Sequence, residues 1–413
     1  MNILFITPYV PNLIRVRPYN LIRELSRRGH QVTVATLWSD DNEREDGDRL
    51  RRVASQVQLV RQPRWRSYLN CVLALPSRSP LQSVYSWNPN LVGKLNGSVK
   101  RLDGKQGFDL VHVEHLRGSR FGLHVKHLNP QTPVVWDSVD CISLLFKLAS
   151  GRSNRITNRM LTSFELGRTR RYESWLLGQF DHTLVTSRID REAMLELSGY
   201  GTERAKRISV LPNGVDLDYF APDENAPREA DTLVVTGKMS YHANVAMVMH
   251  LVKQIMPRVW ATRPEVKLWV VGKDPVPEIR SLSQNPKITV TGTVDDIRPY
   301  LRGACAAVSP VIYGVGIQNK VLEAMACGTA VVSTPQAVST LNVTDGKDVL
   351  IAEHPDIFAR HVLDLLNDQN YRDQIGTAGR KYVEAYHDWS EIANKLGDIY
   401  HETIKRKREG GSL

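Results

Sequence analysis

Short apolar runs bounded by turn residues recur along the whole chain and constrain its fold more than any other feature. The first half contains ILFIT (3–7) and VTVATL (32–37), and the second half contains VKLWVVGKD (266–274). Such runs are typical of parallel strands that are covered on both faces. Segments with helical spacing of apolar residues, such as 19–29 and 244–264, lie between them. The alternation predicts an α/β fold with doubly wound parallel sheets.

The alternation occurs in two successive sets, and this arrangement predicts two Rossmann-like domains. A cluster of turn residues, PNGVD (212–216), separates the two sets, and 413 residues are enough for two or three domains. We therefore expect an N-terminal domain over 1–211 and a C-terminal domain over 212–388. A final amphipathic helix is expected over 389–413.

Composition excludes several classes of protein. The four cysteines (Cys71, Cys141, Cys305 and Cys327) are widely spaced, so neither a disulfide framework nor a zinc ribbon is expected, and each is predicted to be a small buried side chain. No run approaches the roughly 18 apolar residues of a membrane span. The start, MNILFITPYVP, lacks the features of a signal peptide. These patterns predict a cytoplasmic protein.

The net charge bears on the partners of the protein. The formal charge of +10 favours anionic partners such as nucleic acid, anionic lipid or phosphates.

Four motifs give the chain a resemblance to family 4 glycosyltransferases with the GT-B fold. They are PNGVD (212–216), TGKMSYHAN (236–244), VTGTVDD (290–296) and VLEAMACG (321–328). The sequence is similar to bacterial members that build polysaccharides and glycoconjugates. The resemblance implies two Rossmann-like domains facing across a cleft, with the acceptor on the first and the sugar donor on the second. It also implies that the last helix crosses back to the first domain. The implied co-substrate is a nucleoside-diphosphate sugar of the UDP or GDP type, with neither a metal nor another cofactor.

The segment YGVGIQNKVLEAMACG (313–328) predicts a diphosphate site where a glycine loop leads into a helix. The free N–H groups at a helix N-terminus suit a diphosphate, glycine permits close backbone approach, and Lys320 adds a positive charge. The resemblance assigns Glu323 to the ribose hydroxyls and counts it among the catalytic residues. The donor-binding candidates here are Gly316, Ile317, Gln318, Lys320 and Glu323.

Two further strand ends in the second half are expected to contact the donor. In TGKMSYHAN, Gly237 precedes Lys238, which we expect to stabilise negative charge on the departing diphosphate as a catalytic residue. His242 or Ala243 occupies the position of the family's second cation. The segment VTGTVDD resembles the loop that lines the nucleobase, and it does not separate uracil from guanine. Its candidates are Gly292, Thr293 and Val294.

The N-terminal domain contributes polar residues at its own strand ends. By the resemblance, His115 matches the position near the reacting sugar, where its imidazole could bond a hydroxyl or assist proton transfer. Arg15 and Arg17 are expected to face the cleft, where Arg17 would contact a donor phosphate or an anionic acceptor. Asp137 either orients the acceptor or caps the following helix.

Two basic segments of the first half predict contact with an anionic membrane. Residues 61–105 interleave arginines with aromatic and apolar residues, and residues 152–175 form a second basic helix. Basic and apolar residues together suit an anionic bilayer surface, whereas ordinary solvated helix faces are the alternative. The resulting expectation is a peripheral protein on the inner face of the plasma membrane. Its acceptor would be a glycan, a lipid-linked sugar or a small molecule.

The leading interpretation is a glycosyltransferase that transfers sugar with retention to an acceptor hydroxyl in cell-surface polysaccharide or glycoconjugate synthesis. Val315 stands where many family members have a glutamate that meets the donor sugar. A catalytically inactive nucleotide-sugar binder is therefore one alternative, and a nucleotide-sugar epimerase of the same fold is another. A nucleic-acid binder is not expected, because no helix-turn-helix, RNA-binding sheet motif or zinc site occurs in the sequence.

Overall fold

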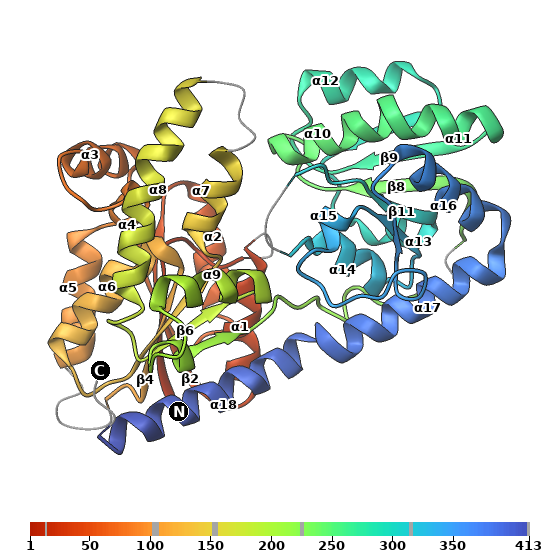
Figure 1. Ribbon diagram of the computed structural model, residues 1–413. Coiled ribbons are helices and arrows are strands. Elements are labelled where there is room, and N and C mark those ends of the chain that lie inside the picture. Colours follow the sequence, from red (N-terminus) through yellow and green to blue (C-terminus); the bar gives the residue numbers. More distant parts are fainter. Residues whose placement is uncertain (13–14, 101–106, 151–155, 224–226, 314–316, 411–413) are drawn as a thin grey trace. The chain divides into compact units, whose positions relative to one another are not determined.

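The structure, a computed structural model, describes residues 1–12, 15–100, 107–150, 156–223, 227–313 and 317–410 (Figure 1). The chain forms two compact units. Unit 1 comprises Met1–Pro212 together with Trp389–Leu413, and unit 2 comprises Asn213–Asp388. Each unit contains one parallel sheet with helices packed on it, so the predicted α/β class with two Rossmann-like domains is confirmed.

Within the described part of unit 1, seven parallel strands form one sheet in the order β3-β2-β1-β4-β5-β6-β7. The central strands are buried along almost their whole length, as their apolar sequences predict. The unpredicted strand β3 is an edge strand with polar residues at its ends. The strands are β1 (Asn2–Thr7), β2 (Gln31–Trp38), β3 (Gln56–Arg61), β4 (Leu110–Glu114), β5 (Val134–Val139), β6 (His182–Val185) and β7 (Ile208–Val210).

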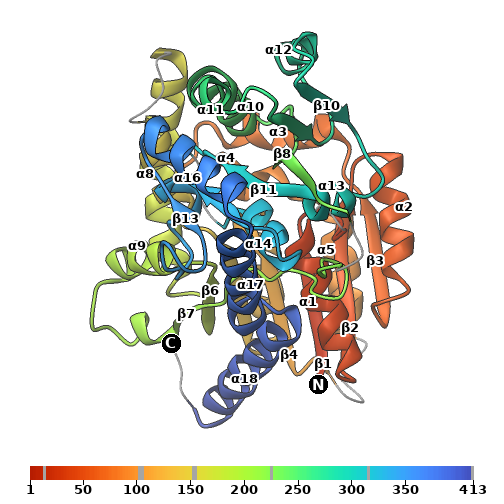
Figure 2. The same cartoon turned by 90° about the vertical axis from the view of Figure 1, so that its right-hand side faces the viewer.

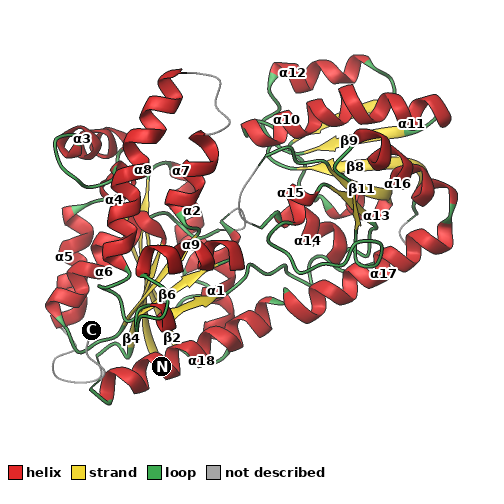
Figure 3. Ribbon diagram, viewed as in Figure 1, coloured by secondary structure: helices red, strands yellow, loops and turns green. Residues whose placement is uncertain are grey.

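Helices cover both faces of this sheet (Figure 3). Apolar residues of α1, α2 and α18 pack on one face, and those of α5, α6, α8 and α9 pack on the other. The C-terminal helix α18 lies beside α1 (Figure 2). Its Trp389 and Tyr400 are among the largest buried side chains. The helices are α1 (Val16–Arg27), α2 (Asp41–Leu50), α3 (Arg64–Ala74), α4 (Leu81–Tyr85), α5 (Pro89–Lys100), α6 (His115–Leu128), α7 (Ile142–Ser150), α8 (Ile156–Leu176), α9 (Arg188–Ser198), η1 (Ala205–Arg207) and α18 (Trp389–Arg408).

Unit 2 has a parallel sheet in which the described strands follow the order β10-β9-β8-β11-β12-β13. Strand order reverses between β8 and β11, as it does between β1 and β4 in unit 1. Open α/β sheets bind ligands at the carboxyl ends of strands beside such a reversal. The strands are β8 (Glu229–Thr236), β9 (Lys267–Val271), β10 (Ile288–Gly292), β11 (Ala304–Ser309), β12 (Val331–Ser333) and β13 (Leu350–Ile351).

The helix expected over 244–264 is broken into α10, a π-helical turn η2 and α11. Pro257 causes the break, because proline has no N–H and its ring clashes with the carbonyl four residues earlier. The helices of unit 2 are α10 (His242–His250), η2 (Leu251–Ile255), α11 (Met256–Thr262), α12 (Pro277–Arg280), η3 (Ser281–Gln284), α13 (Arg298–Gly303), α14 (Asn319–Ala326), α15 (Pro335–Val338), α16 (Pro355–Asn367) and α17 (Gln369–Tyr386).

The turns after β8 and β9 approach each other so closely that both need glycine. Gly237 has a φ of 154° and Gly272 a φ of 148°. A Cβ on Gly272 would lie 1.7 Å from the carbonyl oxygen of Gly237. A Cβ on Gly237 would lie 2.7 Å from the side-chain Nδ2 of Asn244. A side chain at position 272 would therefore force apart the backbone at the carboxyl edge of the sheet, and one at position 237 would displace the Asn244 side chain.

We expect Gly272→Ala to lower the melting temperature of unit 2 by roughly 5 °C or more, because the clash is with backbone that cannot rotate away. Differential scanning calorimetry measures this change. Gly397→Ala on α18 is the control, since no atom lies within 4 Å of its added Cβ and alanine favours helix by about 1 kcal/mol. Equal melting temperatures for Gly272→Ala and wild type would contradict the close approach.

Candidate functional site

In unit 2 the side chain of Asn244 joins the two sides of the strand reversal. Its Nδ2 donates to the carbonyl oxygen of Lys238 at 3.0 Å, and its Oδ1 accepts from Lys320 Nζ at 2.6 Å. Lys238 belongs to the turn after β8, whereas Lys320 lies in the first turn of α14, which follows β11. One buried amide thus brings both predicted lysines to the carboxyl edge of the same sheet.

Lys320 and Glu323 lie three residues apart on α14, and burial perturbs both. Burial lowers the pKa of Lys320 to about 8, and Glu323 partly opposes this shift. Burial raises the pKa of Glu323 to about 7, against the effect of Lys320. Among the described residues none donates a hydrogen bond to the Glu323 carboxylate. Perturbed groups that face a ligand edge are typical of functional sites.

Lys238 has a different environment from Lys320. Its side chain is about half exposed, and its ammonium group lies 3.7 Å from Asp274 Oδ2, in the turn after β9. Exposed ion pairs of this kind are weak, so Lys238 can exchange Asp274 for a ligand. His242, at the family's second cationic position, stacks on Tyr313 with ring centroids 5.6 Å apart.

The segment predicted to hold the nucleobase lines an open cavity of about 400 Å³. Gly292, with a φ of 70°, and Thr293 both contribute to it, whereas Val294 packs against the apolar core instead. Val290 and Thr291 of the same segment also line the cavity, which is completed by residues that the sequence did not single out: Asp274, Pro275, Arg280 and Ser283.

The remaining donor candidates adjoin the start of α14. Gln318 occupies the N-cap position and accepts from Lys320 Nζ at 3.4 Å through its Oε1. Ile317 packs against the core beside it. Gly316, with Val315, lies outside the described residues.

Arg17, which was predicted to contact a donor phosphate or an anionic acceptor, is a buried residue of unit 1. It is only 4% exposed, and its Nε and Nη2 lie 2.9 and 2.8 Å from Asp137 Oδ2. Its Nη1 donates to the carbonyl oxygens of Leu211 and Pro212 at 2.9 and 3.2 Å. These contacts bury the guanidinium, and they tie α1 and β5 to the segment that leads out of unit 1.

Asp137 does not cap the next helix, which was one of its two predicted roles. Its carboxylate binds Arg17, and its Oδ1 accepts from the backbone N–H of Val139 at 3.1 Å. The start of α7 is instead bound by Glu173, which accepts from the N–H groups of Ile142 and Ser143 at 2.8 and 3.1 Å. The buried position of Asp137 also argues against direct contact with an acceptor.

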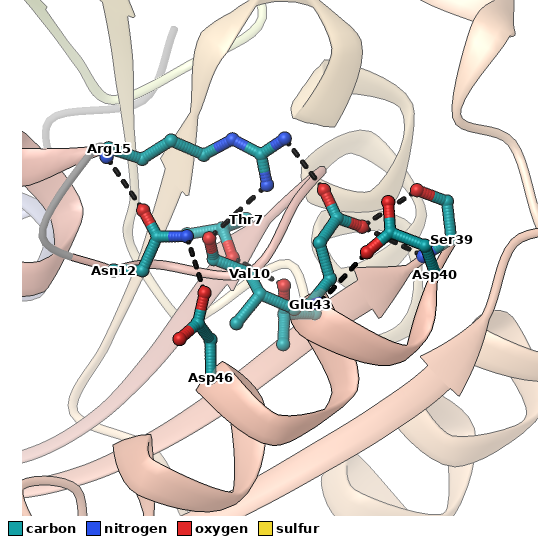
Figure 4. A network of polar contacts seen from close by, with 9 residues as sticks. Thr7, Val10, Asn12, Arg15, Ser39, Asp40, Glu43 and Asp46 are labelled. Atoms are coloured by element: carbon teal, nitrogen blue, oxygen red, sulfur yellow. Dashed lines mark hydrogen bonds and ion pairs between the residues drawn. The ribbon is translucent and has the colours of Figure 1, made fainter. Parts of the chain in front are cut away.

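Arg15 is only partly buried, and residues of unit 1 bind its side chain (Figure 4). Its Nη2 donates to Glu43 Oε1 at 2.7 Å, and its Nη1 donates to the carbonyl oxygen of Val10 at 3.3 Å. Its backbone N–H donates to Asn12 Oδ1, and Asn12 in turn donates to Asp46. These contacts fasten the loop after β1 to α2.

His115 opens α6 directly after β4, at the predicted edge of the sheet. Burial and the nearby Arg117 lower its pKa to about 3, so the ring is neutral near pH 7. A base with so low a pKa accepts protons poorly, so the environment favours hydrogen bonding over proton transfer. Its φ is 62°, and the other non-glycine positive φ values in the described chain belong to Val139 and Asp274, also at carboxyl ends of strands. Strained residues cluster at functional sites.

Beside His115 lies a carboxyl group that the sequence analysis missed. Glu114 is 1% exposed, the Tyr9 hydroxyl approaches it, and its Oε2 has no hydrogen-bond partner among the described residues. Burial and Asp137 raise its pKa to about 8. Burial and Asp190 similarly raise the pKa of Asp140 to about 7. The polar residue at the end of an apolar strand, in HVEH, was the available signal for Glu114.

The outer face of α3 is an apolar surface exposed to solvent. Trp65 and Leu73 are 60% and 68% exposed, and the other members follow helical spacing on the same face. We call this surface the α3 face; its residues are Trp65, Tyr68, Leu69, Val72 and Leu73. Arg64 and Arg78 flank it and are exposed.

The second basic segment is less uniform than predicted. Arg152 and Arg155 lie outside the described residues. Arg168 is mostly buried over the Phe164 ring and donates to the carbonyl oxygens of Leu75, Ser77 and Ser79, so it supports the end of α3. Arg170 and Arg171 are exposed, as the prediction requires.

Other features of the described residues concern disulfides, metal sites and membrane-spanning helices. Cys141, Cys305 and Cys327 are buried and Cys71 is half-buried, and all four are free thiols. No group of three His, Cys, Asp or Glu residues in the described ranges is placed to bind a metal. None of the described helices combines the length and apolar character needed to cross a bilayer.

The fold and its ligand edges define the class of protein. Two parallel α/β units of this kind form the GT-B glycosyltransferase architecture, and the solved structure of HepE from Anabaena in complex with UDP-glucose has it. That structure superposes with a TM-score of 0.68 at 15% identity, covering 97% of this chain and 100% of the other.

Sequence profiles identify the family. The Glycosyltransferase Family 4 profile matches residues 15–219, and the profile of Glycosyl transferases group 1 matches residues 230–368. The chain therefore belongs to the family 4 glycosyltransferases, as its motifs predicted.

Curated relatives match about half of the chain at 28% to 30% identity. The phosphatidyl-myo-inositol mannosyltransferase of Mycobacterium tuberculosis is 28% identical over 47% of this chain and 53% of its own length. A GDP-mannose-dependent monoacylated alpha-(1-6)-phosphatidylinositol monomannoside mannosyltransferase of Corynebacterium glutamicum is 30% identical over 46% and 55%, respectively. The chain thus spans about half the length of these relatives.

We expect Glu114→Gln to become progressively more stable than wild type as pH rises from about 4.5 to 8. The folded protein keeps the Glu114 proton up to about pH 8, whereas the unfolded chain releases it near 4.5. The stability present below pH 4.5 is therefore lost as pH rises through the folded pKa, and glutamine avoids the loss. Urea unfolding of both proteins at several pH values measures the difference.

Glu196→Gln, at an exposed position on α9, is the control and should show no such trend. A stability difference between Glu114→Gln and wild type that stays constant from pH 5 to 8.5 would rule out a buried, protonated Glu114.

Proposed function

We propose that the protein transfers a sugar from a nucleoside-diphosphate sugar, of the UDP or GDP type, to an acceptor hydroxyl. The proposal rests above all on the carboxyl edge of unit 2, where the Asn244 side chain binds the backbone carbonyl oxygen of Lys238 and the ammonium group of Lys320. Two cations and a helix N-terminus at one edge suit a diphosphate. Family membership supports the same reaction.

Each residue of this edge has a proposed role in the transfer. Lys238 and Lys320 stabilise the negative charge that develops on the departing diphosphate, and Glu323 accepts hydrogen bonds from the ribose hydroxyls. The bond between the sugar C1 and the diphosphate oxygen breaks, and the acceptor oxygen bonds C1 on the same face, with retention. The acceptor proton passes to the diphosphate. Because lysines and backbone N–H groups supply the positive charge, we propose that no metal ion takes part.

The acceptor is proposed to bind at the carboxyl edge of unit 1. Neutral His115 and the protonated carboxyls of Glu114 and Asp140 offer both donors and acceptors of hydrogen bonds, which suits the hydroxyl groups of a sugar or polyol. This proposal gives a function to the unpartnered Glu114 Oε2, because a buried polar atom without a partner is costly unless a ligand supplies one.

The cellular role that we propose is synthesis of a bacterial cell-surface polysaccharide or glycoconjugate at the inner face of the plasma membrane. The α3 face combines exposed aromatic and aliphatic side chains with flanking arginines, a combination that suits an anionic bilayer. The M. tuberculosis and C. glutamicum relatives are named for phosphatidylinositol-based acceptors. A lipid-linked acceptor is therefore proposed here too.

Binding of a nucleotide sugar is expected to be strongest between about pH 7 and 8. Glu323 must be ionised to accept from the ribose, and Lys320 must keep its proton to bind the diphosphate. Lys320→Met should weaken binding on the order of 10- to 100-fold, as expected for a lost charge-assisted hydrogen bond, and should remove the alkaline limb of the pH profile. Glu323→Gln should remove the acidic limb. Isothermal titration calorimetry with UDP-glucose and GDP-mannose measures both.

A nucleotide sugar is the suitable probe, because it lacks the phosphate ionisation near pH 6 of a terminal phosphate. Lys347→Met, at an exposed position in unit 2, is the matched control and should bind as wild type does. Wild-type affinity in both Lys320→Met and Glu323→Gln would refute the proposed donor site.

If the α3 face binds the bilayer, the protein should float with vesicles in proportion to their phosphatidylglycerol content, and salt should weaken this binding. Replacing Trp65 and Leu73 together by serine should reduce flotation by at least ten-fold, because both apolar anchors are lost. Tyr200→Ser is the control, since Tyr200 is equally exposed but lies outside the α3 face. Undiminished flotation of the double variant would place the contact elsewhere.

A further inference from the structure

The cavity beside β10 carries two charged side chains whose arrangement bears on which nucleobase the donor has. Asp274 follows β9, and Arg280 ends α12. Ser283 of η3 and Thr293 after β10 add hydroxyl groups to the same lining. At about 400 Å³ the cavity has ample room for a purine.

Asp274 is held in place by its backbone and is free to change partners. Its φ of 55° lies in the left-handed region, which aspartate and asparagine tolerate better than most residues. Its Oδ2 faces Lys238 at 3.7 Å in an exposed ion pair. A ligand can replace such a weak pairing with little loss.

Arg280 is oriented by one hydrogen bond that leaves its outer nitrogens available. Its Nε donates to the carbonyl oxygen of Pro275 at 2.8 Å, on the loop that also carries Asp274. Within the described ranges no carboxylate lies within ion-pair distance of its guanidinium. The loop therefore presents an acceptor pair and a donor pair together.

Among the common bases, guanine fits this combination. Its N1–H and N2 amino group are adjacent donors that a carboxylate can accept together, and its O6 and N7 are adjacent acceptors that arginine can bind with two N–H groups. Uracil offers one N–H between two carbonyl oxygens, so a carboxylate gains one bond and faces like partial charges. Adenine presents the N1 lone pair where guanine has a proton.

We propose that this cavity binds guanine, with Asp274 accepting from the N1–H and amino group and Arg280 or its neighbouring hydroxyls binding O6 and N7. The inference rests on the proposed function, since it names the base of the donor nucleotide. The proposal also couples recognition of the base to binding of the diphosphate. When guanine binds the Asp274 carboxylate, the ion pair with Lys238 breaks, and Lys238 can bind the diphosphate.

The test is calorimetric titration of the full chain with GDP, IDP, UDP and ADP. IDP lacks only the 2-amino group of GDP, so it isolates one of the two hydrogen bonds assigned to Asp274. Wild type should bind GDP at least ten-fold more tightly than UDP or ADP, with IDP between. Asp274→Asn, which suits the left-handed backbone, should erase most of the preference for GDP over IDP. It should leave UDP binding unchanged or stronger, because Lys238 is freed.

The opposite responses of GDP and UDP distinguish base recognition from general damage, which would weaken both. Arg280→Met should also weaken GDP more than UDP, and Asp295→Asn, at an exposed position after β10, is the matched control. Preference for UDP or ADP in wild type, or an unchanged ratio of GDP to IDP affinity in Asp274→Asn, overturns the inference while leaving the proposed function intact. Failure of all four nucleotides to bind overturns both.

Discussion

The two hydrogen bonds of the Asn244 side-chain amide hold together the carboxyl edge of the unit 2 sheet, where the donor is proposed to bind. The amide is nearly buried and links the backbone after β8 to Lys320 on α14, so two segments about eighty residues apart are held as one surface. A partly buried ammonium group needs such a partner, because burial of an unpaired charge is costly. The same amide leaves no room for a side chain at Gly237, and the Gly237 carbonyl leaves none at Gly272. The Asn244 side chain thus accounts for the glycine at position 237 and for the position of the Lys320 ammonium group.

The carboxyl edges of the two sheets differ in electrostatic character. The edge of unit 2 has two lysines and a helix N-terminus, which suit an anion. The edge of unit 1 has Glu114 and Asp140, whose raised pKa values indicate carboxyls that are protonated to a large extent near pH 7. Its nearby arginines are engaged by Asp137 and Glu43. This difference is the basis for proposing a charged donor at unit 2 and a hydroxyl-bearing acceptor at unit 1. The formal charge of +10 does not by itself locate either site.

Periodicity and turn residues were sufficient to predict most strands and both sheets, because fully apolar runs have few alternatives in an α/β chain. They missed β3, which has polar ends, and β13, which is only two residues long. The break at Pro257 could have been predicted from proline alone.

The sequence also predicted that Lys238, Lys320 and Glu323 lie at one edge of a sheet, because they follow or adjoin strands of that sheet. The sequence could not predict which of the two lysines is buried, because only the packing shows that Lys320 is. It could not reveal that Arg17 is enclosed, and it missed Arg280 because that residue lies on a short helix away from any strand end.

Hydrogen exchange of the full chain with and without a saturating nucleotide sugar tests the central claim most directly, since it reports where the ligand protects the backbone. Slower exchange is predicted in the turn after β8, at residues 237–241, and at the start of α14, at residues 317–323. The amino ends of the strands in both units should exchange as in the free protein. Protection confined to those amino ends, with 237–241 and 317–323 unchanged, would contradict the account.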